Sequence, residues 1–314
     1  MIACEHDNSR FSTSIHPYKT RRRITMIHTG YIGLGNIGKP MCANLIKNAS
    51  AAGLAVTVYD VMPDPVAEMV ALGARAASSV ADIAASCELI GVCVRDDNDV
   101  DSLLYGEGGL LALAAPGTII AVHSTVTKNN TLRWAKDGAE KNIHIIDAPI
   151  TGGAQGAADG TLCIMVGGPD DVLQRAQAMF ACTSKKVVHG GDVGAGIALK
   201  LANNLINYAG FTAISEGVAL VKHFGLNPEH LYAVGQANGV ITPMMQQFIS
   251  GREGLLAGCS AEEMESIFGP FAGLAEKDLD HALNLADELK VALEATRQVR
   301  KGIRNTFLKG VSAQ

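Results

Sequence analysis

Short apolar runs alternate with longer helix-like segments between about residues 27 and 190, and this alternation constrains the fold more than any other feature of the sequence. Strand patterns separated by helical patterns are typical of βαβ units, which build a mainly parallel sheet covered by helices. We expect strands at Ile27–Ile32, Ala55–Tyr59, Leu89–Val94, Thr118–Val122, Ile143–Asp147, Leu162–Val166 and Lys186–Val188. The helices expected between them are Ile37–Ala51, Pro65–Leu72, Asn129–Lys141 and Asp170–Met179.

The pattern changes after Gly196, where the strand-like runs stop. Ile197–Phe224 is one long segment with helical spacing, and the remainder of the chain keeps that spacing. The further helices expected are Pro228–Ala237, Ala261–Ile267, Ala272–Leu289 and Val291–Lys301. The sequence therefore predicts an α/β domain followed by an all-helical domain, joined through a long helix that starts near residue 195.

The first expected strand runs into Gly33-Leu34-Gly35-Asn36-Ile37-Gly38, a G-x-G-x-x-G turn that opens a helix. Such glycines permit a tight turn and close approach of a diphosphate, which then faces the helix N-terminus, although glycines also make plain turns. The second expected strand ends at Asp60, whose carboxylate can accept both hydroxyls of a ribose and repels a 2′-phosphate. NAD is therefore preferred over NADP as the expected cofactor. The residues expected to bind it are Gly33, Gly35, Asn36, Ile37, Gly38 and Asp60.

These motifs predict an α/β fold with a Rossmann-type dinucleotide-binding domain and an all-helical domain for substrate binding and dimerisation. The boundaries expected are 1–25 for an N-terminal extension, 26–190 for the dinucleotide-binding domain and 191–314 for the helical domain. The extension carries Arg21, Arg22 and Arg23 but also Glu5 and Asp7, which a transit peptide would disfavour. A dispensable extension or a misplaced start is therefore preferred over a mitochondrial signal.

Composition excludes several classes of protein. With 26 basic and 31 acidic side chains, the chain has a net charge of -5, too acidic for a protein that grips nucleic acid. Its seven cysteines contain no C-x-x-C pair, so neither a disulfide framework nor a zinc site is expected, and a cytoplasmic location fits best. The uncharged stretches Gly108–Thr127 and His230–Gly251 hold proline and polar residues, so no membrane span is expected. The histidines lack metal-ligand spacing, and we expect no metal.

Two loops after expected strands carry groups suited to a substrate. His123-Ser124-Thr125 places hydroxyls at a strand end, where they either face a ligand or cap the next helix. Asp147–Ala154 contains Thr151, Gly152 and Gly153, whose hydroxyl and consecutive N–H groups suit a carboxylate, although a flexible loop would also explain the glycines.

Lys200 and Asn204 are four residues apart at the start of the long helix and so share one face. A lysine there is either a solvated surface charge or a group directed into the cleft. Partial burial would lower its pKa towards the working pH and allow it to exchange a proton with a hydroxyl or carbonyl oxygen.

The order and spacing of these segments resemble the β-hydroxyacid dehydrogenase family, which includes 3-hydroxyisobutyrate dehydrogenase and tartronate semialdehyde reductase. The resemblance covers about residues 26–305. The motifs that carry it lie at Gly33–Met41, Asp147–Gly153, Gly194–Asn204 and Lys277–Leu279. It implies that Lys200 is the catalytic acid/base, that Asn204 bonds the substrate hydroxyl, and that Thr151, Gly152 and Gly153 hold the substrate carboxylate. It further implies that Thr125 lies against the nicotinamide or substrate, that Val94 binds the cofactor, and that Lys277 closes the cleft and binds both substrate and cofactor.

Departures from the family pattern limit what the resemblance implies about the substrate. Val94-Arg95-Asp96-Asp97 stands where many relatives have Leu-Pro, so the loop over the cofactor is expected to differ. His123 precedes the strand-end hydroxyls and Thr151 replaces the commoner serine; both are expected near the substrate.

The function expected is NAD-dependent oxidation of a small 3-hydroxy acid that bears a carboxylate, or reduction of the corresponding semialdehyde, by a homodimer or homotetramer. An NADP-dependent semialdehyde reductase and an imine reductase are the enzyme alternatives, and a non-catalytic dinucleotide-binding module is the alternative from another class. Lys200 argues against the imine reductase and the binding module, because both usually lack a lysine at this position.

Overall fold

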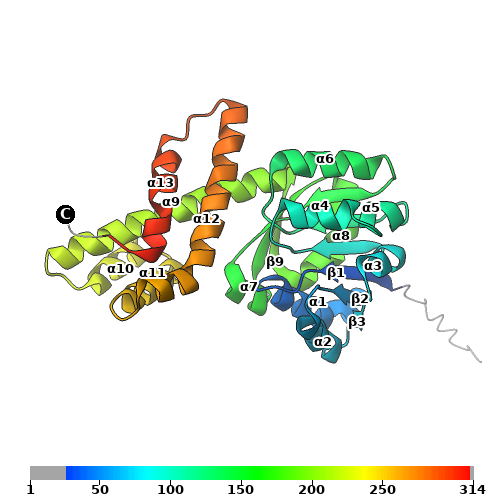
Figure 1. Ribbon diagram of the computed structural model, residues 1–314, viewed down its shortest axis with the longest axis horizontal. Helices are drawn as coiled ribbons and strands as arrows, with labels where there is room; N and C mark the ends of the chain where they lie inside the picture. Colours follow the sequence, from blue (N-terminus) through cyan, green and yellow to red (C-terminus); the bar gives the residue numbers. More distant parts are fainter. Residues whose placement is uncertain (1–25, 312–314) are drawn as a thin grey trace, which may run out of the picture.

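The structure is a computed structural model that describes residues 26–311 (Figure 1). The predicted extension at 1–25 lies outside the described residues. One sheet dominates the N-terminal part, with strands β1 (Ile27–Ile32), β2 (Leu54–Tyr59), β3 (Arg75–Ala76), β4 (Leu89–Val92), β5 (Ile119–Val122), β6 (His144–Asp147), β7 (Ile150–Thr151), β8 (Leu162–Gly167) and β9 (Ser184–Gly191). Its helices are α1 (Gly38–Ala52), α2 (Pro63–Ala71), α3 (Val80–Ser86), α4 (Asp97–Tyr105), α5 (Leu110–Leu113), α6 (Lys128–Ala139), α7 (Gly153–Asp159) and α8 (Asp170–Thr183).

The strands follow the order β3-β2-β1-β4-β5-β6-β8-β7, and β9 pairs with β8. All neighbours from β3 to β6 are parallel, whereas β8 runs antiparallel to β6. The order reverses between β1 and β4, and ligands of such sheets bind in the crevice beyond the strand ends at this point. The predicted fold class, a Rossmann-type domain followed by helices, is confirmed.

Both faces of the sheet are covered, which explains why its central strands read as unbroken apolar runs. All four residues of β4 and of β5 are buried. On one face, α1 and α8 pack against the sheet through residues such as Leu45 and Phe180. On the other face, α3, α4 and α6 do so through Ile83, Leu104 and Trp134.

The C-terminal part of the described chain is helical, with α9 (Ala195–His223), α10 (Pro228–Ala237), α11 (Pro243–Leu256), α12 (Ala261–Leu289) and α13 (Glu294–Leu308). Helix α9 runs out of the sheet region and forms the base on which the other helices pack (Figure 1). Its first turns belong to the sheet domain's core through Ile197 and Leu201, and its later turns pack with α12 and α13.

Several predicted boundaries were wrong. The helices predicted at 261–267 and 272–289 are one helix, α12, with Pro270 inside it, because Phe268, Ala272 and Ala275 enter one buried cluster and hold both halves in line. The last helix starts three residues later than predicted and continues to Leu308. The elements not predicted were β3, β7, α3, α4, α5, α7 and α11, most of them short or polar at their starts. Within residues 26–311 no helix is long and apolar enough to span a bilayer.

Candidate active site

The predicted phosphate-binding turn has the backbone geometry that a dinucleotide needs. Gly33 has a φ of 94°, and a Cβ there would lie 2.2 Å from the Cys93 carbonyl oxygen. At Gly38 a Cβ would lie 2.0 Å from the Gly33 carbonyl oxygen, whereas at Gly35 it would meet nothing within 4 Å. Only glycine fits the first and last positions, and the open space at Gly35 leaves room for a ligand.

A cleft of about 660 Å³ lies over this turn. Seven residues from the predicted set line it, namely Gly33, Gly35, Asn36, Ile37, Gly38, Asp60 and Val94. Further lining residues come from the β4–α4 segment, namely Cys93, Arg95, Asp99, Ser102 and Leu103, and Leu274 comes from α12. Of these, Arg95 belongs to the loop that was expected over the cofactor. The described residues therefore fit a dinucleotide, with the helical region forming part of the cleft wall.

Asp60 follows β2 directly, as predicted. One carboxylate oxygen accepts the Leu34 N–H at 2.6 Å and the other accepts the Met62 N–H at 2.8 Å. Each carboxylate oxygen can accept more than one hydrogen bond, so these contacts fix Asp60 at the cleft without using up its acceptors. A neighbouring cavity of about 580 Å³ is also lined by Asp60, and no lysine or arginine is among the described residues that line it.

The loop after β5 is joined to the loop after β4 by Ser124. Its hydroxyl donates to the Val94 carbonyl at 2.7 Å and accepts from the Val94 N–H at 2.9 Å. His123, expected near the substrate, is instead buried in the sheet domain between Tyr31 and Phe180, and its Nδ1 lies 2.8 Å from the Ala148 carbonyl. Burial lowers the pKa of His123 to about 4, so it is a neutral core residue.

The start of α9 is anchored to the sheet by Asp147. This buried carboxylate, at the end of β6, accepts the N–H groups of Gly194 and Ile197, each at 2.7 Å. Two glycines pack against this carboxylate. A Cβ at Gly167 or at Gly196 would lie within 2.8 Å of a carboxylate oxygen of Asp147, so both positions require glycine. The contact fixes the helix one turn before Lys200.

Lys200 is half-buried, and its pKa is lowered mainly by that burial. Asp278 raises the pKa of Lys200 and Lys277 lowers it further, so these two charged residues of α12 both act on the Lys200 amine. A lysine with a lowered pKa can release and accept a proton more readily than a solvated one. The alternative of an ordinary surface lysine is therefore disfavoured.

Asp278 is the acidic centre of a buried side-chain cluster. Its Oδ2 accepts from the Asn204 amide at 2.7 Å and from the Tyr208 hydroxyl at 3.1 Å. Asp278 Oδ1 lies 3.4 Å from the Lys277 Nζ. The Asn203 amide donates to the Asn204 side-chain oxygen at 3.2 Å and towards the Thr151 hydroxyl at 3.4 Å. Residues from β7, α9 and α12 thus meet in one network.

Lys277 connects the helical region to the sheet domain, since its Nζ donates to the Thr125 carbonyl oxygen. Farther along α12, Glu288 accepts from Asn129 at 2.7 Å and pairs with Lys128 at 3.4 Å. The predicted closing residue therefore lies at the junction, although neither Lys277 nor Thr125 lines the 660 Å³ cleft.

The predicted anion loop begins α7. Gly152 and Gly153 have φ values of 128° and 66°, and both are exposed. Exposed consecutive amides at a helix start suit an anion, and Thr151 lies beside them.

The sequence analysis did not predict Asp278 and Tyr208 as residues of this cluster. Asp278 lies in the Lys277–Leu279 motif, so its position next to Lys277 was the signal that could have identified it. Among residues 26–311, no three metal-ligating side chains gather.

Comparisons with known proteins agree with this geometry. Residues 28–191 match the model of the NAD binding domain of 6-phosphogluconate dehydrogenase, and residues 194–311 match the NAD-binding model of NADP-dependent 3-hydroxyisobutyrate dehydrogenase. The chain is 36% identical to 2-(hydroxymethyl)glutarate dehydrogenase of Eubacterium barkeri, with 87% of this chain and 83% of that protein covered. It is 34% identical to 3-hydroxyisobutyrate dehydrogenase of Pseudomonas aeruginosa, with 67% and 69% covered.

A solved structure has the same fold. The 3-hydroxyisobutyrate dehydrogenase of Mycobacterium tuberculosis, with L-serine, superposes with a TM-score of 0.73 at 24% identity and covers 88% of this chain and 92% of its own. The family models together span nearly all described residues, and the relatives are named dehydrogenases that act on hydroxy acids. The chain therefore belongs to the β-hydroxyacid dehydrogenase family and is an NAD(P)-dependent dehydrogenase that acts on CH–OH donors.

Proposed function

We propose that this dehydrogenase uses NAD⁺ to oxidise the hydroxyl of a small 3-hydroxy acid, or NADH to reduce the corresponding semialdehyde, with Lys200 as the acid/base. The observation that carries the proposal is the half-buried Lys200, four residues before Asn204 on α9, whose pKa is lowered mainly by burial and is also influenced by the charges of Asp278 and Lys277. When bound, the nicotinamide supplies the acceptor for hydride.

Each residue of the cluster has a defined part in the proposal. Neutral Lys200 takes the hydroxyl proton during oxidation and returns it during reduction. Asn204 orients the substrate hydroxyl, and Asp278 fixes Asn204 through the hydrogen bond at 2.7 Å. Thr151 and the N–H groups of Gly152 and Gly153 hold the carboxylate, while Thr125 borders the reacting carbon.

The preference for NAD is supported by the adenosine end of the cleft. Asp60 is the charged side chain among the described residues that line the 580 Å³ cavity, and a 2′-phosphate beside it would meet a negative charge. An NADP-specific site needs a cation for that phosphate, and the described residues that line the cavity offer none.

The substrate class is supported by the names of three relatives. The relatives act on 3-hydroxyisobutyrate, 2-(hydroxymethyl)glutarate and L-serine by their names. All three molecules carry a hydroxymethyl group next to a carbon that bears a carboxylate or leads to one. We infer a primary alcohol in this position for the substrate of this chain.

A homodimer or homotetramer is the proposed assembly. Large apolar side chains are exposed on the helical region, among them Ile206 and Leu220 on α9, Phe224 just after it, and Val234 on α10. Burying them against another copy would remove apolar surface from water. Light scattering coupled to size exclusion would measure the subunit count, and a monomer would contradict this part of the proposal.

The function is tested with a substrate panel that follows NADH absorbance. The panel contains 3-hydroxyisobutyrate, D- and L-serine, glycerate and 2-(hydroxymethyl)glutarate, each with NAD and with NADP. The amide of the best acid serves as the matched control, because donors arranged for an anion should reject it. Turnover of an acid with NAD, and weak turnover of its amide, is expected. Equal turnover of acid and amide, or a clear preference for NADP, would contradict the proposal.

A further inference from the structure

Arg95 stands at the mouth of the cofactor cleft, in the loop where the family pattern has Leu-Pro. It lines the same 660 Å³ cleft as Gly35, Asn36 and Ile37 of the phosphate-binding turn. Its side chain is 85% exposed. The guanidinium forms a two-point contact with Asp99, with Nε–Oδ2 at 2.8 Å and Nη2–Oδ1 at 2.7 Å. An arginine so exposed and so placed is available to a ligand in the cleft.

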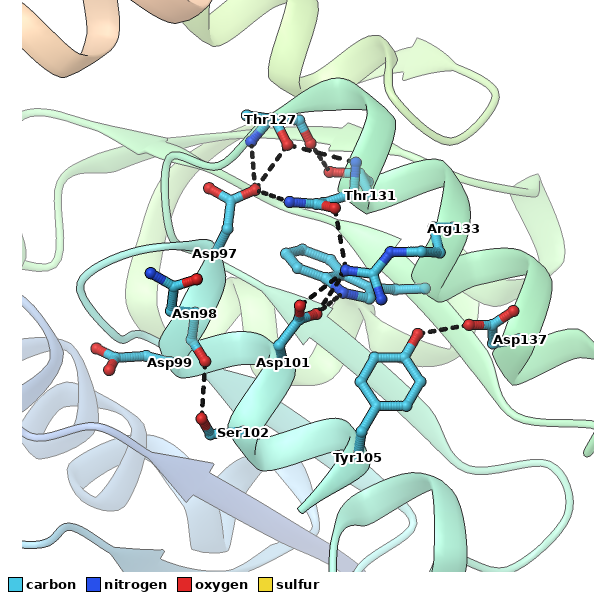
Figure 2. Close-up of polar contacts among 12 residues, drawn as sticks. Asp97, Asn98, Asp99, Asp101, Ser102, Tyr105, Thr127, Thr131, Arg133 and Asp137 are labelled. Atoms are coloured by element: carbon cyan, nitrogen blue, oxygen red, sulfur yellow. Dashed lines mark hydrogen bonds and ion pairs between the residues drawn. The ribbon is translucent and has the colours of Figure 1, made fainter.

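Helix α4 gives Asp99 a fixed position. Figure 2 shows Asp97, Asp101 and Tyr105 directed at α6, whereas Asp99 and Ser102 lie on the other side of the helix. Asp97 accepts from the Thr127 hydroxyl at 2.6 Å, and Asp101 accepts from Arg133 at 2.7 Å. Because one face of α4 is held by these contacts, the opposite face presents Asp99 to the cleft, where both Asp99 and Ser102 line the wall.

The cleft offers little positive charge to balance a bound anion. Arg95 is the one cationic side chain among the described residues that line the cleft, beside the acidic Asp60 and Asp99. Helix α1 offers its N-terminus with no acidic residue in the first turn. A dinucleotide brings a negative charge on each phosphate, and a guanidinium opposite the helix N-terminus would bind them with charge-assisted hydrogen bonds.

We propose that Arg95 binds the diphosphate of the dinucleotide, and that Asp99 holds the guanidinium at the cleft until it exchanges that carboxylate for the diphosphate. This inference rests on the proposed use of a dinucleotide and extends its site to a residue outside the glycine-rich turn. Asp99 competes with the ligand for Arg95. The two residues therefore have opposite effects on affinity.

The test measures binding of ADP and of adenosine to the full chain by calorimetry, with no turnover involved. Arg95→Gln should weaken ADP binding roughly tenfold, the size of one charge-assisted contact, and leave adenosine unchanged. Asp99→Asn should tighten ADP binding about two- to fivefold, because the competing charge is gone. The double variant should match Arg95→Gln alone. Arg297→Gln is the matched control, since this arginine pairs with Asp287 in the helical region.

Unchanged ADP affinity in Arg95→Gln would overturn the inference, and so would an equal loss for ADP and adenosine, which would indicate a structural role of the loop. A loss confined to the KM of the hydroxy acid would assign Arg95 to the substrate instead and also overturn it. The binding result is separable from the proposed function, because an enzyme inactive on the whole panel would still distinguish ADP from adenosine.

Discussion

The cofactor side of the proposed active site is built from backbone, whereas its proposed reacting side is built from side chains that come from distant segments. On the first side, Gly33 and Gly38 are required by their close approach to other backbone atoms. On the second side, Asn204 of α9, four residues after Lys200, donates to Asp278 of α12, 74 residues farther along the chain. Substitutions on the two sides should therefore act differently. On the first side they cause steric conflict with the backbone, and on the second side they alter the charge and burial around Lys200.

The largest effect is expected on the reacting side. Lys200→Ala should lower kcat by roughly 10²–10⁴-fold, the usual contribution of a general acid/base, with the Kd for NADH nearly unchanged. Lys222→Ala is the matched control on the same helix, because that lysine is exposed and pairs with Glu253. Stopped-flow turnover and NADH titration measure both quantities. Retention of most activity in Lys200→Ala would remove the lysine from the chemistry.

The next effect tests the backbone-built side. Gly38→Ala should destabilise the fold by about 1–3 kcal/mol, because its Cβ would lie 2.0 Å from the Gly33 carbonyl oxygen. Gly35→Ala is its control: the added Cβ meets nothing within 4 Å, so urea unfolding should be unchanged while NADH binding weakens. An equal loss of stability in both variants would contradict the claim that the fold needs glycine at Gly38 but not at Gly35.

Asp278→Asn should have a smaller effect, with kcat reduced about tenfold, since one charged hydrogen-bond partner is replaced by a neutral one of the same shape. Asp278 raises the pKa of Lys200, so removing its charge should shift the pH limb of oxidation to lower pH. Asp280→Asn, a half-buried neighbour that pairs with Arg300, is the control. A variant with lower kcat but an unmoved pH limb would limit Asp278 to a structural role.

The smallest effect is expected at the edge of the junction. Glu288→Gln should change the KM values less than about fivefold, because exposed ion pairs contribute little and are screened by salt. The adjacent Asp287→Asn should change neither KM, since Asp287 pairs with Arg297 within the helical region. Measuring both variants at low and high salt separates them. An effect of Asp287→Asn as large as that of Glu288→Gln would show that the contact between the domains has no specific role.

The backbone-built side could be predicted from sequence because its signal is local. The glycine spacing and the carboxylate after the second strand lie within one βαβ unit, and the structure places Gly33–Gly38 and Asp60 along one cleft. The sequence could also predict that Lys200 and Asn204 share a helix face, because residues four apart on a helix lie on the same side.

The remaining features depend on contacts that no local pattern encodes. Asp278 contacts Asn204 only because α12 packs along α9, and its motif neighbour Lys277 attracted the prediction instead. His123 was predicted near the substrate from its place beside Thr125. The imidazole instead packs between Tyr31 and Phe180, which come from distant segments of the chain. Arg95 gained its position from α4, a helix that was not predicted.

The pH dependence of turnover in both directions tests the central claim most directly. In the proposed mechanism, oxidation needs the neutral Lys200 amine and reduction needs the ammonium. Oxidation should therefore rise with pH and reduction should fall, through one limb located below the ordinary lysine pKa of 10.5. The limb should be absent in Lys200→Ala. Rates that change in the same sense in both directions, or a limb that persists in Lys200→Ala, would contradict the assignment of Lys200 as the proton-exchanging group.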